Sequence, residues 1–340
     1  SEVAELLGWN YMEGMRLFMV ISLVPPTSDE NVTVTDTEFS NVPVRLFVPR
    51  RAPGGLRRAV IFFHGGGWCL GDAGIQTYDV LTRRISNELD AVVVSVNYRL
   101  APPHHFPAQF EDVYAVTKWF LQRPVLAQHG VDPGRVCVAG DSAGGNLAAA
   151  VAQQVQQGCS ALSIGALGVS PSLGTAQRAG LGDCHRALGT GTWLCLSHWG
   201  HRRGWRGIRA LSPQNTPCPP LGAHSTPTLT HLGWFRCDVW GGNFNYRCNQ
   251  QGKQANRKTL TNEPRLRRLP PALLLTCQHD VLRDDGLMYA ARLRAAGVPV
   301  TLHHARDAFH GALTFLSWPF ELALAHRLLA TCLDWLRDNL

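Results

Sequence analysis

The stretch Arg135-Val-Cys-Val-Ala-Gly-Asp-Ser-Ala-Gly-Gly-Asn-Leu-Ala-Ala-Ala150 predicts a strand, a sharp turn and a helix. A short apolar run leads into Gly140-Asp-Ser-Ala-Gly144, and an alanine-rich sequence follows. Glycines on both sides of Ser142 permit a tight turn that lifts the serine hydroxyl clear of the sheet. A bare Gly-x-Ser-x-Gly also occurs by chance in glycine-rich chains. The flanking strand and helix therefore support Ser142 as a nucleophile for acyl transfer.

Two stretches are suited to stabilise a negatively charged oxygen beside that serine. The amide of Ala143 opens the predicted helix, where the helix dipole is positive. Gly65, Gly66 and Gly67 follow the apolar run at residues 59–63, and glycines allow backbone amides to approach a substrate closely. A phosphate-binding loop is excluded here because no Gly-Lys-Ser/Thr follows. We expect these four amides to form an oxyanion hole.

Strands and helices alternate along the chain, which predicts an α/β fold whose mostly parallel central sheet has helices on both faces. Chemistry in such a fold lies at the carboxyl ends of the strands. The expected strands are residues 31–35, 42–48, 59–63, 91–96, 135–140, 272–276 and 298–302, the first two forming a hairpin. The expected helices are residues 76–89, 108–121, 143–157, 285–296 and 318–340.

The length of 340 residues suits one domain, 1–340, with its core at 1–159 and 265–340. Residues 160–264 form an aberrant insert or a lid, because they combine many Gly, Pro and Arg with only a poor strand candidate at 162–169. The apolar run at residues 15–24 is about half of a bilayer span, which indicates an interfacial or core helix. Because the chain begins at Ser1, we expect an upstream targeting or anchoring segment to be missing.

The net charge of +7 does not indicate a nucleic-acid partner. Residues 160–262 hold eleven Lys or Arg and two Asp, whereas the remainder holds 21 basic and 23 acidic residues. The basic excess thus belongs to one segment of an otherwise nearly neutral globular protein. We expect no nucleic-acid binding.

The same segment raises the question of a metal site. It contains cysteines and histidines with no Cys-x-x-Cys pair, a spacing that fits no zinc pattern. We expect neither a metal nor another cofactor. The candidate ligands are Cys184, His185, Cys195, His198, His201, Cys218, Cys237 and Cys248.

Three residues at predicted strand ends occur in the order Ser142, Asp280, His310, which is typical of an α/β-hydrolase. His310 would accept the serine proton and return it to the leaving group, and Asp280 would orient the imidazole. Asp284 and Asp285 are rival acids, but their place at the beginning of a helix is explained by capping.

His303 and His304 are rival bases. Both lie within or at the end of the last predicted strand, where alternation directs one side chain to each face. A structural role therefore explains them better than a catalytic one.

Several stretches resemble the hormone-sensitive-lipase branch of the α/β-hydrolases, and within it the arylacetamide deacetylase family. The resemblance covers about residues 1–158 and 265–340. The matching text is Asn31-Val-Thr-Val-Thr35, His64-Gly-Gly-Gly-Trp-Cys69, Asn97-Tyr-Arg-Leu-Ala-Pro102, Phe110-Glu-Asp-Val-Tyr114, Gly140 to Ala150, and Thr276-Cys-Gln-His-Asp-Val-Leu-Arg-Asp-Asp-Gly-Leu-Met-Tyr289.

This resemblance implies a serine esterase or amidase that hydrolyses hydrophobic acyl esters, including lipid esters, and acetylated arylamines. It implies a position on the lumenal side of the endoplasmic reticulum membrane, held by an amino-terminal signal anchor. It further implies a disulfide between Cys69 and Cys277, worth up to roughly 5 kcal/mol in the chain-entropy model. A glycan on Asn31, in the acceptor triplet Asn31-Val-Thr33, is implied likewise.

The sequence departs from the family pattern in two places. Ala308 stands where the family has glycine, a mild change beside His310. Residues 160–264 barely match, and 167–171 resemble a degraded form of the family's next strand, a central member of the sheet. Two alternatives to hydrolysis follow: a non-catalytic ligand-binding protein on the same fold, and an inactive product with a disrupted central segment.

Overall fold

The computed structural model describes residues 11–155, 166–169, 266–319 and 321–340. The chain divides into two compact units. Met15–Leu173 and Leu260–Leu340 belong to one of them, which contains nearly all the described residues. Apart from 166–169, the predicted insert at 160–264 lies outside the described residues, so its interpretation as a lid or an aberrant segment stays a prediction.

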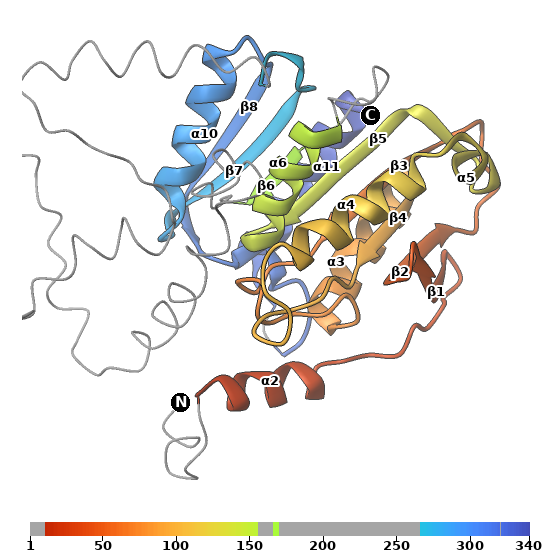
Figure 1. Ribbon diagram of the computed structural model, residues 1–340, viewed down its shortest axis with the longest axis horizontal. Helices are drawn as coiled ribbons and strands as arrows, with labels where there is room; N and C mark the ends of the chain where they lie inside the picture. The colour runs from red at the N-terminus through yellow and green to blue at the C-terminus, as the bar shows by residue number, and fades with distance from the viewer. Residues whose placement is uncertain (1–10, 156–165, 170–265, 320) are drawn as a thin grey trace, which may run out of the picture. The chain divides into compact units, whose positions relative to one another are not determined.

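The described residues form an eight-stranded sheet in the order β1-β2-β4-β3-β5-β6-β7-β8 (Figure 1). The first two strands are an antiparallel hairpin, as predicted, and β2 pairs antiparallel with β4. All remaining pairs are parallel, so the carboxyl ends of six strands lie at one edge of the sheet. The strands are β1 (Val32–Phe39), β2 (Val42–Pro49), β3 (Arg57–Phe63), β4 (Ala91–Val96), β5 (Val131–Asp141), β6 (Ala166–Val169), β7 (Ala272–His279) and β8 (Val300–Phe309).

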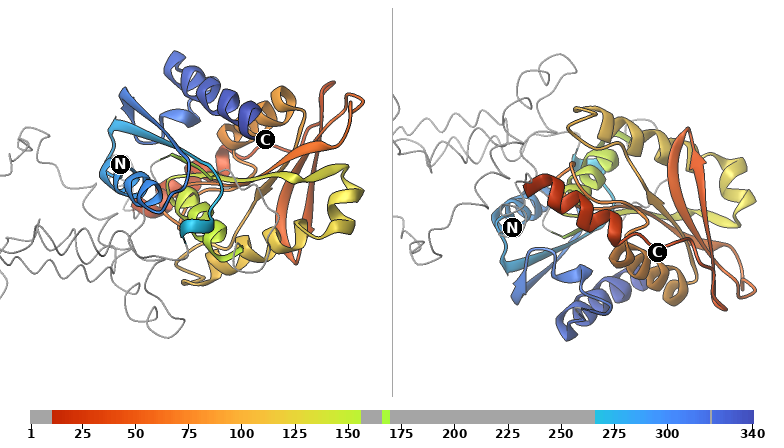
Figure 2. Two further views of the ribbon diagram at one scale, coloured as in Figure 1. Left: turned by 90° about the horizontal axis from the view of Figure 1, so that it is seen from above. Right: turned by 90° about the horizontal axis from the view of Figure 1, so that it is seen from below.

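Helices cover both faces of this sheet. Helices α3 and α11 pack on one face, and α4, α6 and α10 on the other (Figure 2). Their bounds are α3 (Gln76–Leu89), α4 (Ala108–Phe120), α6 (Ala143–Val155), α10 (Arg283–Ala295) and α11 (Ala323–Asn339). Shorter elements are α2 (Tyr11–Ile21), α5 (Arg123–Gln128) and the 3-10 turns η2 (Leu266–Arg268) and η3 (Ala312–Thr314).

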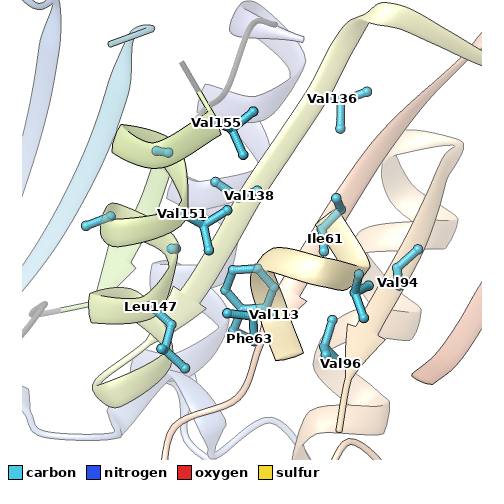
Figure 3. Packing of buried hydrophobic residues seen from close by; sticks show 14 of the residues in the cluster. Ile61, Phe63, Val94, Val96, Val113, Val136, Val138, Leu147, Val151 and Val155 are labelled. Atoms are coloured by element: carbon cyan, nitrogen blue, oxygen red, sulfur yellow. The ribbon is translucent and has the colours of Figure 1, made fainter. Parts of the chain in front are cut away.

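Strand β3 illustrates why an uninterrupted apolar run suits the middle of such a sheet. Successive side chains of a strand point to opposite faces, so both faces need apolar residues here. Ile61 and Phe63 are fully buried against α4 and α6 (Figure 3), whereas Val60 and Phe62 belong to the cluster beneath α3 and α11. Each such burial is worth about 1.5–3 kcal/mol.

Most predicted elements match the structure, and α3 and β4 have the predicted bounds. The apolar pattern predicts that the last strand ends at residue 302. This prediction is wrong, because β8 continues to Phe309. This strand lies at the sheet edge, where charged residues such as Arg306 and Asp307 interrupt the apolar pattern without ending the strand. The final helix begins at Ala323, later than the predicted residue 318.

The weakest strand prediction concerned the segment at 162–169. Residues Ala166–Val169 do form β6, and it pairs with β5 on one side and β7 on the other. The sheet therefore keeps its central member between the strands that lead to Ser142 and Asp280. One of the two alternatives raised by the sequence, an inactive product with a disrupted central segment, stays a prediction because residues 170–265 lie outside the described residues.

Helix α2 corresponds to the apolar run predicted as an interfacial or core helix. Its Phe18, Val20 and Ile21 side chains are 58%, 62% and 73% exposed, so it is not a core helix. Across the described residues, none of the helices has the length and apolar character needed to cross a bilayer.

Candidate active site

Ser142 occupies the turn that the sequence predicts. Strand β5 ends at Asp141, helix α6 begins at Ala143, and Ser142 itself has a left-handed φ of 53°. The neighbouring glycines are required by close backbone packing. A Cβ on Gly144 would lie 1.9 Å from the carbonyl oxygen of Phe63, and one on Gly140 would lie 2.5 Å from the carbonyl carbon of Gly144. Such a tight, strained turn presents the serine at the strand end.

Asp280 and His310 follow the ends of β7 and β8, which are adjacent parallel strands. Their side chains meet in a hydrogen bond of 2.9 Å between His310 Nδ1 and Asp280 Oδ1. The same carboxylate oxygen accepts the backbone N–H of Leu282 at 2.7 Å. The Asp280 side chain is fully buried, whereas 41% of the His310 side chain is exposed. This arrangement fixes the imidazole and leaves one ring nitrogen for proton transfer.

The electrostatics of His310 suit a base. Burial alone disfavours the charged imidazole, but the hydrogen bond and charge of Asp280, together with the charge of Asp141, outweigh it and raise the pKa of His310 above its usual 6.5. Within the described part of the chain, no hydrogen bond joins Ser142 to His310. Catalytic hydrogen bonds often shorten only when substrate binds.

The rival acids and bases have other positions. Asp284 and Asp285 lie in the first turn of α10, where a carboxylate favours the positive end of the helix dipole, but the N-cap position itself is Leu282 and has no side-chain cap hydrogen bond. His303 and His304 lie within β8, and His304 hydrogen-bonds Thr276 Oγ1 at 3.0 Å and Gln278 Oε1 at 2.9 Å through its two ring nitrogens. Neither pair takes the place of Asp280 and His310.

The glycine loop at residues 65–67 lies beside the serine turn because Phe63 of β3 is in register with Gly140 of β5. Gly66 and Gly67 have φ values of 109° and 61°, which side chains disfavour. A Cβ on Gly65 would lie 2.6 Å from Asp141 Oδ2, and one on Gly66 would lie 2.2 Å from the carbonyl oxygen of Leu70. The loop thus requires glycine in order to approach the turn at Ser142.

Two buried aromatic rings support this loop, and the sequence analysis missed them. His64 stacks on Tyr98 with ring centroids 4.3 Å apart, and Tyr98 Oη donates to the carbonyl oxygen of His64 at 2.7 Å. Burial lowers the pKa of His64 to about 4, so the ring is neutral near pH 7. The sequence motifs include both His64 and Tyr98, but sequence alone does not reveal that the two rings stack.

The implied disulfide between Cys69 and Cys277 is absent: both residues are buried free cysteines. Burial raises the pKa of both thiols, that of Cys277 to about 12 with further help from the charges of Asp280 and Asp307.

Three other sequence predictions concern positions around the site. Ala308, the departure from family glycine, is fully buried in β8. Asn31 is exposed immediately before β1, as a glycan acceptor must be. The described residues contain no cluster of three or more potential metal ligands, and the cysteines and histidines considered for zinc lie outside them.

Comparison with known proteins identifies related enzymes. The model of a family described as having the alpha/beta hydrolase fold matches residues 60–206 and 244–314. This match extends into the segment at 160–264, beyond the range over which the sequence motifs suggested a resemblance.

Curated relatives align with the whole chain. Arylacetamide deacetylase of Rattus norvegicus is 41% identical, and the alignment covers 100% of this chain and 89% of the relative. Neutral cholesterol ester hydrolase 1 of Bos taurus is 37% identical with the same coverage.

Solved esterase structures share the architecture. A hyperthermophilic esterase from the archaeon Pyrobaculum calidifontis is 28% identical, with a TM-score of 0.60 over 96% of this chain and 91% of that one. A thermostable esterase from Pseudomonas putida is 25% identical, with a TM-score of 0.62 over 100% and 95%.

Proposed function

Because this chain belongs to the α/β-hydrolase fold family and is an ester hydrolase, we propose that it acts on hydrophobic acyl esters and acetylated arylamines through an acyl-enzyme. The hydrogen bond between Asp280 and His310 is the observation that carries the mechanism. It joins two strand ends that are 30 residues apart in sequence, and the imidazole also lies within the electrostatic influence of Asp141, the residue before Ser142.

In the proposed first step, His310 accepts the proton of Ser142 Oγ while that oxygen attacks the acyl carbon. The amides of Gly66, Gly67 and Ala143 donate to the oxygen that becomes negative, each donor typically lowering the barrier by about 3 kcal/mol. The Gly65 N–H, which the sequence also placed in the oxyanion hole, instead donates to the Tyr78 hydroxyl at 2.9 Å. His310 then protonates the leaving alcohol or amine, and the acyl group stays on Ser142. Water, deprotonated by His310, releases the acid and restores the serine.

The substrate class rests on the relatives. One is named for deacetylation of arylacetamides and another for hydrolysis of cholesterol esters, and both kinds of substrate join a carbonyl to a large apolar group. We expect the chain to accept small-molecule esters or amides of this kind. A non-catalytic binding protein is the alternative, and it predicts ligand binding without turnover.

A fluorophosphonate probe tests the proposal, because such probes react only with an activated serine. We expect labelling of Ser142, located by mass spectrometry of the digested protein, and release of p-nitrophenol from p-nitrophenyl esters. The matched control is Ser142→Ala, which should lose both signals while its circular dichroism stays unchanged. Folded wild-type protein that is neither labelled nor active would overturn the proposal.

We further propose that the protein resides on the lumenal side of the endoplasmic reticulum membrane, attached by an amino-terminal signal anchor and carrying a glycan on Asn31. The resemblance to the arylacetamide deacetylase family and the exposure of Asn31 support this location. The test is the sensitivity of the expressed protein to an endoglycosidase.

A further inference from the structure

A buried tyrosine lies between the oxyanion loop and the serine turn. Tyr78, near the start of α3, accepts a hydrogen bond from the backbone N–H of Gly65 at 2.9 Å. Its hydroxyl donates to Asp141 Oδ2 at 3.1 Å, and Asp141 immediately precedes Ser142. One phenolic oxygen thus connects the two loops that must cooperate at the reacting carbonyl.

Gly65, Tyr78 and Asp141 are packed so closely that an added side chain at Gly65 would not fit. A Cβ on Gly65 would lie 2.6 Å from Asp141 Oδ2 and 3.0 Å from Tyr78 Oη, so backbone, carboxylate and phenol are packed directly together. Both Tyr78 and Asp141 are nearly inaccessible, with 8% and 5% of their surfaces exposed. Water is therefore a poor substitute if the hydroxyl is lost, and the Gly65 N–H would be left without its acceptor.

The charges agree with this direction of hydrogen bonding. Burial, with the charge of Asp141, raises the pKa of Tyr78 well above 10, so its hydroxyl keeps the proton that it donates. Burial raises the pKa of Asp141 to about 6, and the hydrogen bond from Tyr78 partly offsets that shift by favouring the carboxylate. The carboxylate also favours the charged form of His310.

We propose that Tyr78 is a positioning residue that anchors the start of the glycine loop, and with it the following amides of Gly66 and Gly67, by bonding the Gly65 N–H and Asp141 at once. This inference rests on the proposed hydrolysis. In it, Tyr78 does not contact the substrate. A misplaced amide weakens interactions made in the transition state, and so lowers kcat more than it changes KM.

The experiment compares Tyr78→Phe with Tyr289→Phe. Tyr289, on α10, is also buried and hydrogen-bonded, to Gln153, so its variant is a matched loss of one buried hydroxyl away from the site. For Tyr78→Phe we expect kcat on p-nitrophenyl butyrate to fall about tenfold with KM changed less than about twofold. An aryl trifluoromethyl ketone, which forms a tetrahedral adduct with serine, should bind about tenfold more weakly. Tyr289→Phe should change neither value.

A second variant covers the case in which Tyr78→Phe does not fold. Asp141→Ala removes the acceptor of the tyrosine hydroxyl and should also lower kcat without raising KM. When both substitutions fold, the double variant should lose little more than the more damaging single one, since both break one linkage.

The outcomes separate the two hypotheses. Wild-type protein that turns over ester, together with an unchanged kcat and ketone affinity in Tyr78→Phe, overturns the role of Tyr78 alone. Fully additive losses in the double variant also contradict it, as does an unchanged kcat in Asp141→Ala. Wild-type protein without turnover or fluorophosphonate labelling overturns the hydrolase proposal, and this inference with it.

Discussion

Single residues in the site owe their properties to burial and to one or two specific partners. Asp280 is fully buried yet held next to His310, and the pair keeps the imidazole oriented and its pKa raised. Burial raises the pKa of Asp141 to about 6, and the hydrogen bond from Tyr78 and the charge of His310 offset this only in part. The two carboxylates, both of which favour the charged form of His310, therefore differ in their hydrogen-bond partners.

Asp280→Asn should lower kcat about 10³- to 10⁴-fold, because the amide no longer stabilises the charged imidazole or fixes its tautomer. Steady-state hydrolysis of p-nitrophenyl esters measures this. Asp284→Asn and Asp285→Asn are the matched controls from the first turn of α10, and they should retain nearly full activity. A larger loss in either control than in Asp280→Asn would assign the acid elsewhere.

The pH profile reports the same pair. The neutral imidazole is the base, so kcat/KM should fall as pH decreases through the raised pKa of His310, with a midpoint above its ordinary 6.5. Asp280→Asn removes the carboxylate that raises the pKa of His310, so the midpoint of the residual activity should move to lower pH. A wild-type midpoint below the ordinary value, or one that rises in the variant, contradicts the assigned partnership.

At the level of elements, the β5–turn–α6 unit depends on glycines that no other residue replaces. Gly144→Ala would drive its new methyl group into the carbonyl of Phe63, and that oxygen belongs to strand β3. We expect the free energy of unfolding to decrease by about 3 kcal/mol or more, measured by urea denaturation. Gly54→Ala, where nothing lies within 4 Å, should change it by less than about 0.5 kcal/mol. Equal stability of the two variants would show that the turn tolerates a side chain.

Element boundaries were predictable where the apolar pattern was strong and local. Helix α3 and strand β4 match because each has an uninterrupted pattern between clear ends. The pattern failed at β8, since an edge strand can face solvent with charged residues. Strand β6 was hard to recognise in the sequence because it has only four residues. Its pairing with β5 and β7 defines it as a strand, rather than its own composition.

In the whole molecule, the parallel sheet brings sequence-distant loops to one edge. The loops after β3, β5, β7 and β8 carry Gly65, Ser142, Asp280 and His310 respectively. Two buried apolar clusters, one on each face, hold the strands in register, so the site depends on packing far from the chemistry.

The proposed location predicts a glycan. When the chain is expressed in mammalian cells behind a signal anchor, endoglycosidase H should increase its electrophoretic mobility. Asn31→Gln should have the faster mobility already and show no further change, with its esterase activity retained. Wild-type protein that is insensitive to endoglycosidase H and to peptide N-glycosidase contradicts the glycan on Asn31.

Local sequence was sufficient to predict the sharp turn at Ser142, the glycine loop and the places of Asp280 and His310 after their strands, because each depends on a few neighbouring residues and on periodicity. It did not reveal that Cys69 and Cys277 are free, or that Tyr78 bonds Gly65 and Asp141. Those facts depend on strand register and helix packing between segments up to 208 residues apart in the printed numbering. Burial then sets the charge of Asp141 and the stacking of His64 on Tyr98, and burial exists only once the chain has folded.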